Sequence, residues 1–342
     1  HPLHETIILR HEKIYAPKWK RPPQPPQIAD IIPEVRRLLL AGEYQRAAQL
    51  TIETILERDE DYRSRISLPP GVTYDQLDAK KIPPFPVSIR PSHGHPCFAM
   101  RVDLPEAGDI RDYVRTLDFR SGETQVHWTD ERGTWQRSQF ISRADGAMVQ
   151  RLTPPAGQLL NATILLDERL PGMPRDLRFT RDFDGQHLLV TGQYDPAISN
   201  KGYAGVTRVV LDGGSAEMAG DTLVIREARS ALLLTGIEWY PDFSRDKIAA
   251  LIERVEHIEP DYNRLLERHT HIHGEIFDRV TLDVGGGEAR HHSSEELLAE
   301  ELLHPTVHPA LMEKMFDMGR YFLLVECGEL PPIWGHVNIN VN

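Results

Sequence analysis

The sequence is poor in cysteine, in long apolar runs and in net positive charge. Cys97 and Cys327 are the two cysteines among 342 residues, too few for a disulfide framework, so cysteine usage leaves the redox compartment open. The longest apolar runs, such as 231–234, have the length of a strand and fall far short of the ~18 residues of a membrane-spanning helix. Acidic side chains outnumber basic ones by 51 to 39, giving a formal net charge of −12 and a pI near 5.7. This balance argues against a protein that binds nucleic acid through a basic face.

Several catalytic signatures are also missing. The glycines at 285–287 lack the Lys-Ser/Thr of a phosphate-binding loop, so we interpret them as a flexible turn between a strand and a helix. No G-x-S-x-G motif occurs, and neither cysteine has a recognisable nucleophile context. On a helix, His269, His271 and His273 cannot converge on one ion, because neighbours two apart point about 200° away from each other. Only His269 and His273 share a helix face, and no H-E-x-x-H motif or nearby cysteine completes a site. We therefore expect core or interface histidines, with no bound metal and no cofactor.

Local patterns predict three kinds of structure along the chain. Prolines cluster between 17 and 26, which favours an extended surface loop over 16–30. Apolar residues at helical spacing between 33 and 58 predict a helical hairpin. From 83 to 240, short apolar runs alternate with Gly, Pro, Asp and Asn and no helical pattern intervenes, which is typical of an antiparallel sandwich. After Pro241 helical spacing returns: it predicts a helix through 248–255, a second through 262–276 after the break at Pro260, and a third from about 309 to 325.

The strands expected in the sandwich are short. The Asp-Glu-Arg-Gly sequence at 130–133 has the composition of a hairpin turn, and Trp128 and Trp135 flank it. We expect these two rings to pack across the hairpin, although exposed tryptophans would instead stack on sugar rings. The expected strands are 118–119, 125–128, 135–141, 147–152, 159–165, 188–191, 207–211, 222–225 and 231–235.

These patterns divide the chain into three parts. Residues 1–242 form a β-sandwich with a helical excursion at 33–58, residues 243–283 form a helical linker, and residues 284–342 begin an all-helical unit. A helical unit ending at Asn342 would be too small to close its own core, so we expect the sequence to stop inside that unit.

The final stretch, 334–342, carries the most specific polar pattern. In an extended segment, residues two apart face the same side, so His336, Asn338, Asn340 and Asn342 would form one polar row. One interpretation is an edge strand with a solvated polar face. The other is a row of amides lining a pocket, because a carboxamide both accepts and donates hydrogen bonds and so suits a sugar hydroxyl or a held water molecule.

Several segments, in this order, resemble glycoside hydrolase family ninety-five, the inverting α-L-fucosidases and α-L-galactosidases. The resemblance covers nearly the whole chain, with departures at Arg10, where the family usually has Asn, and in the short interval between Trp334 and His336. The segments are ETIILRHEKIYAP at 5–17, IPEVRRLLLAGEYQRAAQL at 32–50, DYVRTLDFRSGETQVHW at 112–128, WQRSQFISRADGAMVQRL at 135–152, RHTHIHGEIFDRVTLDVG at 268–285 and HPALMEKMFDMGRYFLLVECGELPPIWG at 308–335.

The resemblance implies a β + α multidomain protein: an antiparallel β-sandwich, a helical linker and the start of an (α/α)6 barrel that holds the active site. It also implies that Asn338 and Asn340 position the attacking water, with Asn340 and Asn342 as the alternative register. Trp334, His336 and Asn342 would then contact the substrate. An amide is too weak a base to take the proton itself, so a carboxylate would have to, and a second carboxylic acid would protonate the leaving oxygen. No acidic residue of this chain matches either role.

The resulting hypothesis is an inverting glycoside hydrolase that removes terminal α-L-fucosyl or α-L-galactosyl residues from glycans. The alternatives are a non-catalytic glycan-binding sandwich, or a sugar phosphorylase with the same architecture. The expected partner is an oligosaccharide or glycan, with no nucleic acid; oligomeric state, a homo-oligomer included, stays open. We predict no turnover by this chain alone, since its general acid would lie beyond Asn342. Family habit implies an extracellular or periplasmic location.

Overall fold

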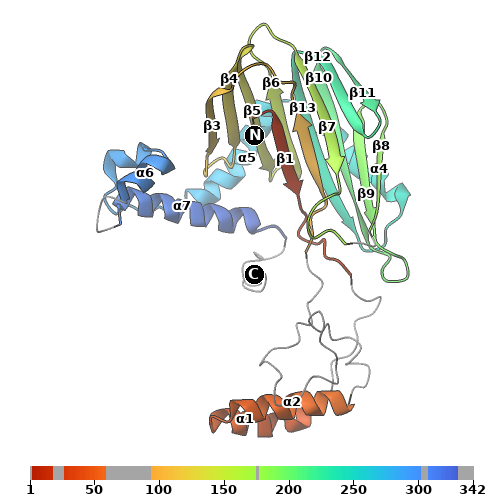
Figure 1. Ribbon diagram of the computed structural model, residues 1–342, viewed down its shortest axis with the longest axis vertical. Coiled ribbons are helices and arrows are strands. Elements are labelled where there is room, and N and C mark those ends of the chain that lie inside the picture. The colour runs from red at the N-terminus through yellow and green to blue at the C-terminus, as the bar shows by residue number, and fades with distance from the viewer. Residues whose placement is uncertain (1, 18–26, 59–93, 175–176, 302–306, 330–342) are drawn as a thin grey trace. The chain divides into compact units, whose positions relative to one another are not determined.

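The computed structural model describes residues 2–17, 27–58, 94–174, 177–301 and 307–329 (Figure 1). They fall into two compact units, each described by itself. The larger unit contains His1–Ile14, Gly94–Pro196 and Asn200–Asn342, and the smaller contains Tyr15–His93 and Ala197–Ser199.

The smaller unit contains the helical hairpin that the sequence predicts. A 3-10 turn, η1 (Ala29–Ile31), leads into α1 (Ile32–Leu40), and α2 (Tyr44–Arg58) follows. Pro33 lies in the first turn of α1, where its missing N–H costs no hydrogen bond. Gly42 adopts a φ of 77° between the helices, a left-handed conformation that favours glycine.

The larger unit is built around two antiparallel sheets, as the sequence predicts. In one sheet the strand order is β1-β2-β7-β12-β11, and in the other it is β3-β4-β5-β6-β13-β10-β9-β8. The first contains β1 (His4–Leu9), β2 (Phe98–Asp103), β7 (Leu160–Asp167), β12 (Thr222–Ala228) and β11 (Ser215–Ala219). The second contains β3 (Arg111–Leu117), β4 (Thr124–Asp130), β5 (Gly133–Ser142), β6 (Ala147–Thr153), β13 (Ser230–Tyr240), β10 (Gly202–Asp212), β9 (His187–Gln193) and β8 (Arg178–Phe183).

Five strands are absent from the expected set, namely β1, β2, β3, β8 and β11. Four of these, β1, β3, β8 and β11, lie at sheet edges with one side unpaired. The edge strand β3 is exposed along its whole length, so its residues show no apolar alternation. The strand expected at 118–119 is wrong. Asp118 lies in the turn between β3 and β4, where its Oδ1 accepts a hydrogen bond from the Ser121 N–H at 2.7 Å.

The core between the two sheets contains the predicted tryptophan pair. Trp128 and Trp135 face each other across the β4–β5 hairpin, with ring centroids 5.7 Å apart and planes within 1°. Both are fully buried, so the packing interpretation is confirmed and neither ring is available to a sugar. The Trp135 indole N–H donates to Asp130 Oδ2 at 3.0 Å, which ties the core to the hairpin turn.

A second core lies on the outer face of the eight-stranded sheet. A 3-10 turn, η3 (Arg245–Lys247), leads into α4 (Ile248–Glu256), and Asp261 then caps α5 (Tyr262–Phe277). These helices cover side chains that alternate with those of the inner core. The buried members are Phe140, Ala147, Val149, Ala204, Val206, Leu232, Leu234, Tyr240, Ile248, Leu251, Val255, Ile258, Tyr262 and Leu265.

The C-terminal part of the larger unit is helical. A 3-10 turn, η4 (Gly287–His291), is followed by α6 (Ser294–Glu301) and α7 (Pro309–Glu326), and α7 packs beside α5 (Figure 1). The start of a barrel, which the resemblance implies, is not shown by the described helices. Over the described ranges, no helix has the length and apolar character needed to cross a membrane.

Replacing Gly236 by Ala should loosen α4 from the sheet. A Cβ at this position would lie 2.8 Å from Val255 Cγ2 and 3.1 Å from Leu251 Cδ1, so the helix would have to shift. We expect a loss of about 1–3 kcal/mol of unfolding free energy by urea denaturation. Gly319→Ala in the interior of α7 is the control, because nothing lies within 4 Å of its added Cβ. It should be neutral or gain up to about 1 kcal/mol; equal effects of the two would contradict this packing.

Candidate functional site

The site residues proposed from the sequence lie outside the described residues. Trp334, His336, Asn338, Asn340 and Asn342 all belong to the segment 330–342. Their roles, and the choice between the two asparagine registers, therefore stay predictions. The part of the larger unit that precedes this segment is described up to Glu329.

Helix α5 is fixed on the sandwich by a column of aromatic rings. His269 stacks on Phe140 at 5.3 Å and on His273 at 5.2 Å, and both histidines are almost fully buried. His273 Nε2 lies 3.0 Å from the Phe119 carbonyl oxygen, which it reaches as a donor. The Arg143 N–H donates to His269 Nδ1 at 3.2 Å. The expectation that His269 and His273 share a helix face and lie in a core is thus confirmed.

These contacts also determine the charge of the two histidines. Burial lowers the pKa of His269 to about 4, and the neighbouring His273 lowers it further in the same direction. Burial lowers the pKa of His273 as well. Both rings are therefore neutral near pH 7, with one nitrogen able to donate and the other to accept. Among the described residues, no group of three His, Cys, Asp or Glu side chains is placed to hold a metal ion.

Arginines join α7 to the sandwich and to α5. The Arg143 guanidinium donates to the carbonyl oxygens of Leu324 and Cys327 at the end of α7. From α7, Arg320 donates to the carbonyl oxygens of Phe277 and Val280 at the end of α5. A cation at a helix C-terminus satisfies carbonyls that lack partners within the helix and compensates the helix dipole. The two arginines therefore set where α7 leaves the sandwich.

The glycine-rich segment 285–287 binds a carboxylate from its own chain. Glu313 of α7 is buried, and its Oε1 accepts hydrogen bonds from the N–H groups of Val284 at 2.7 Å and Gly286 at 3.1 Å. Arg290 Nε lies 3.0 Å from Glu313 Oε2. A Cβ on Gly286 would lie 2.4 Å from that oxygen, so only glycine leaves room for it. The segment is a turn, but it follows α5 and leads into η4, so the expected preceding strand is wrong. The N–H groups of Gly285 and Gly286 are occupied by Asp283 and Glu313.

Two surface hollows lie on the larger unit. The first has a volume of about 450 Å³ beside α5 and contains one carboxylate, Glu267; its Arg120 forms an ion pair with Asp278 at 2.9 Å. The second, of about 280 Å³, contains no carboxylate. Inverting glycosidases flank the scissile bond with two carboxyl groups roughly 6.5–9.5 Å apart. Neither hollow has that pair of carboxyl groups. The residues lining the second hollow had not been singled out in the sequence.

The thiols give no nucleophile in the described part of the chain. Cys97 is fully buried, and burial raises the pKa of its thiol to about 12, which keeps it protonated and inert near neutral pH. Cys327 lies at the end of α7, half-buried.

Comparison with known proteins places the chain among carbohydrate-active domains. A family model described as glycosyl hydrolase family 65, N-terminal domain, matches residues 1–239. The match covers more than half of the chain, so the chain belongs to this family of N-terminal domains. The sandwich of the larger unit lies within the matched range, apart from the last residue of β13. The comparisons do not show family ninety-five.

The comparisons with curated proteins and with solved structures add no further evidence of family. No curated protein matches the sequence. Among solved structures, one described as a kojibiose phosphorylase from the human microbiome matches with 13% sequence identity and a TM-score of 0.42. The match covers 52% of this chain and 27% of that one, so the chain spans about a quarter of the length of that structure.

His269 should make stability depend on pH. The folded protein has a His269 pKa of about 4 and the unfolded chain the ordinary 6.5, so the unfolded state takes up a proton first as the pH falls. The stabilisation is complete above about pH 6.5 and is lost as the pH falls toward 4. We expect the stability gap between the wild type and His269→Gln, measured by denaturant titration, to narrow by up to about 3 kcal/mol over this interval.

The matched control is His271→Gln on the same helix, because His271 is exposed. Its stability should follow that of the wild type at every pH. A constant gap for His269→Gln, or an equal change for His271→Gln, would contradict a neutral buried His269.

Proposed function

We propose that this chain forms the N-terminal part of an enzyme that cleaves glycosidic bonds, with a sugar phosphorylase as the favoured reaction type. The observation that carries the proposal is the family match over residues 1–239. Two architectures that we considered from the sequence, the inverting hydrolase and the phosphorylase, both place a sandwich before a helical catalytic domain. The reaction type has to be argued separately.

The hydrolase hypothesis depends on a resemblance to family ninety-five, because only that resemblance assigns Asn338 and Asn340 to a water molecule. The family to which the chain belongs is a different one, and this removes the specific support for water as the attacking group. A phosphorylase requires less of the protein. Phosphate is itself a competent nucleophile, so a single carboxylic acid that protonates the leaving oxygen completes the machinery.

In the proposed reaction the C1–O glycosidic bond breaks and a phosphate oxygen forms the new bond to C1. The leaving oxygen takes its proton from the acid, so the products are a sugar 1-phosphate and a free sugar hydroxyl. In hydrolysis the same acid would act, but a base would also have to take a proton from water. The requirement for inorganic phosphate therefore separates the two reactions.

The role that we propose for the described part is to support the catalytic domain. On one face of α7, three large apolar side chains lie 45–56% exposed, at Met312, Met315 and Leu323. An amphipathic helix in a soluble protein buries such a face against another element. We propose that further helices of the same enzyme, arranged as a barrel, cover this face. The extracellular or periplasmic location remains a prediction from the resemblance.

The test is cleavage by the longer protein that carries this chain, measured with and without inorganic phosphate. The substrates are a panel of disaccharides, kojibiose included, together with a nitrophenyl α-L-fucoside. We expect phosphate to raise the rate of bond cleavage by at least about tenfold, equivalent to roughly 1.4 kcal/mol of transition-state stabilisation. A sugar 1-phosphate should accumulate in equal amount to the released sugar. The 342-residue chain alone should show no turnover, because in this proposal the general acid belongs to the helical catalytic domain and not to the described sandwich.

The hydrolase alternative predicts the opposite pattern. Phosphate would have no effect, the fucoside would be cleaved, and Asn338→Ala or Asn340→Ala would each lower the rate by about a hundredfold. Phosphate-independent cleavage would therefore overturn the phosphorylase proposal, and turnover by the chain alone would overturn the supporting role.

A further inference from the structure

The second hollow lies on the part of the eight-stranded sheet that α4 leaves uncovered. Its floor is formed by Thr180 of β8 and by Thr191 and Gln193 of β9. In the sheet register Thr180 pairs with Thr191, and Gln193 pairs with Arg178, so these side chains face the same side. That side is the outer one, because Phe179 and Leu188, which alternate with them, contact the inner core. We call this hollow the β8–β9 trough.

An aromatic ring forms one wall of the trough. Phe243 lies over Gly202 of β10, the residue paired with Gln193. A Cβ on Gly202 would come within 2.8 Å of Phe243 Cγ, so the absent side chain makes room for the ring. The Phe243 N–H donates to the Asn200 carbonyl oxygen at 2.8 Å, and Tyr240 contacts the ring edge-on at 5.8 Å. Three contacts therefore fix the position of the Phe243 ring: its packing over Gly202, the backbone hydrogen bond to Asn200 and the contact with the Tyr240 ring.

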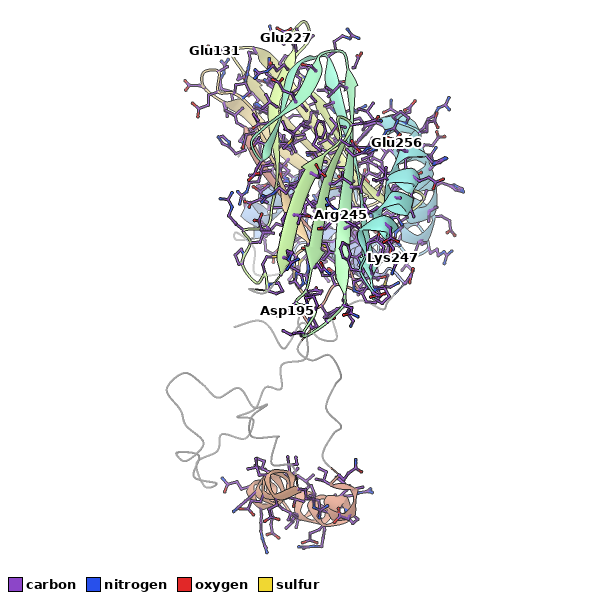
Figure 2. All side chains as sticks on the ribbon, turned by 90° about the vertical axis from the view of Figure 1, so that its right-hand side faces the viewer. Glu131, Asp195, Glu227, Arg245, Lys247 and Glu256 are labelled. Carbon is purple, nitrogen blue, oxygen red and sulfur yellow. The ribbon has the colours of Figure 1, made fainter. Side chains whose placement is uncertain are left out.

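Two guanidinium groups border the same trough. Arg178 forms no ion pair with any described residue, and Arg245 faces only Asp182, at 3.6 Å with both side chains largely exposed. Such an exposed pair contributes little and is easily replaced by another anion. In η3, beside Arg245, Lys247 interacts with Asp242. Figure 2 labels Arg245 and Lys247 at the start of this helix and Glu256 at its end.

The polar groups of the floor are suited to hydroxyls. The Oγ1 atoms of Thr180 and Thr191 lie 2.6 Å apart, so one hydroxyl donates to the other and the second proton remains for a ligand. The Gln193 carboxamide has no hydrogen bond within the described residues and offers both a donor and an acceptor. A volume of about 280 Å³ is near the lower end for ligand pockets and suits one sugar ring.

We propose that the β8–β9 trough binds an acidic sugar, a pyranose ring that carries a phosphate or a carboxylate. The phenyl ring of Phe243 packs against the C–H face of the sugar. Gln193 and the threonine pair bind hydroxyls, and Arg178 and Arg245 bind the anion. A neutral sugar leaves the guanidiniums unused, and inorganic phosphate leaves the aromatic wall unused. With a net charge of −12, the protein as a whole repels anions, so binding depends on these arginines. The proposal does not rest on the proposed enzymatic function.

The test is binding to the 342-residue chain by titration calorimetry, with saturation-transfer NMR to detect sugar protons in contact with the protein. The probes are glucose 1-phosphate, glucuronate, glucose and inorganic phosphate. The first two should bind at least about tenfold more tightly than the last two, because a charge-assisted hydrogen bond is worth at least this factor. Arg178→Ala and Arg245→Ala should each weaken the acidic sugars about tenfold, and Phe243→Leu should reduce the saturation transfer.

Arg226→Ala is the matched control. Arg226 is an exposed arginine of β12 in the other sheet, paired with Glu217 at 3.2 Å, and its loss should leave binding unchanged. Melting temperatures by circular dichroism show whether each variant is folded, and Gln193→Ala replaces Phe243→Leu if the latter unfolds. Equal binding of glucose and glucuronate, equal binding of inorganic phosphate and glucose 1-phosphate, unchanged binding by both arginine variants, or no binding at all would each overturn the proposal. Turnover and phosphate dependence of the longer protein are independent of these outcomes.

Discussion

The packing of α5 on the eight-stranded sheet determines where everything after the sandwich lies. The sheet carries apolar side chains on both faces, so its outer face must be covered, and α4 and α5 supply that cover. Within this contact, the neutral rings of His269 and His273 continue the column that begins at Phe140. Histidine serves here as a flat aromatic group that also satisfies backbone groups of two sandwich turns. Arg143 of the sandwich and Arg320 of α7 then position α7, because Arg143 donates to the Cys327 carbonyl oxygen at the end of α7 and Arg320 donates to the Phe277 carbonyl oxygen at the end of α5.

Close approach in this unit repeatedly depends on a missing Cβ. Gly236 lets α4 reach the sheet, Gly202 makes room for Phe243, and Gly286 admits the carboxylate of Glu313. In each case a side chain from a later part of the sequence packs directly against the backbone of the glycine. A close-packed interior transmits any added volume to its neighbours, because it has few voids that could absorb it. Gly236 therefore sets the spacing of α4 on the sheet, Gly202 that of Phe243 on the sheet, and Gly286 that of α7 on the glycine turn.

The arrangement separates support from chemistry. The aromatic pair inside the sandwich, the buried thiol of Cys97 and the occupied glycine turn all act within the fold. The family match places this architecture at the N-terminal end of carbohydrate-active proteins. The exposed apolar face of α7 and the polar, arginine-bordered trough at β8 and β9 are two surfaces of the described residues for which the fold itself gives no role. Their chemistries differ, since one suits further protein and the other a small polar ligand.

By itself, the sequence determined the sandwich, the helical hairpin, α5, α7 and the hairpin turn at 130–133, because apolar periodicity and turn residues are local properties. It also determined that His269 and His273 share a helix face. It did not reveal β3 or β8, because edge strands with exposed faces lack apolar alternation, and strand pairing joins residues far apart in the chain. Only the tertiary structure decided that Trp128 and Trp135 are buried, that Glu313 fills the glycine turn, and that residues 178–193 and 243–245 border one trough. The physical reason is that burial depends on which elements pack against each other. A local sequence pattern shows which side chains share one face of a helix or strand, but it does not show which other element packs on that face.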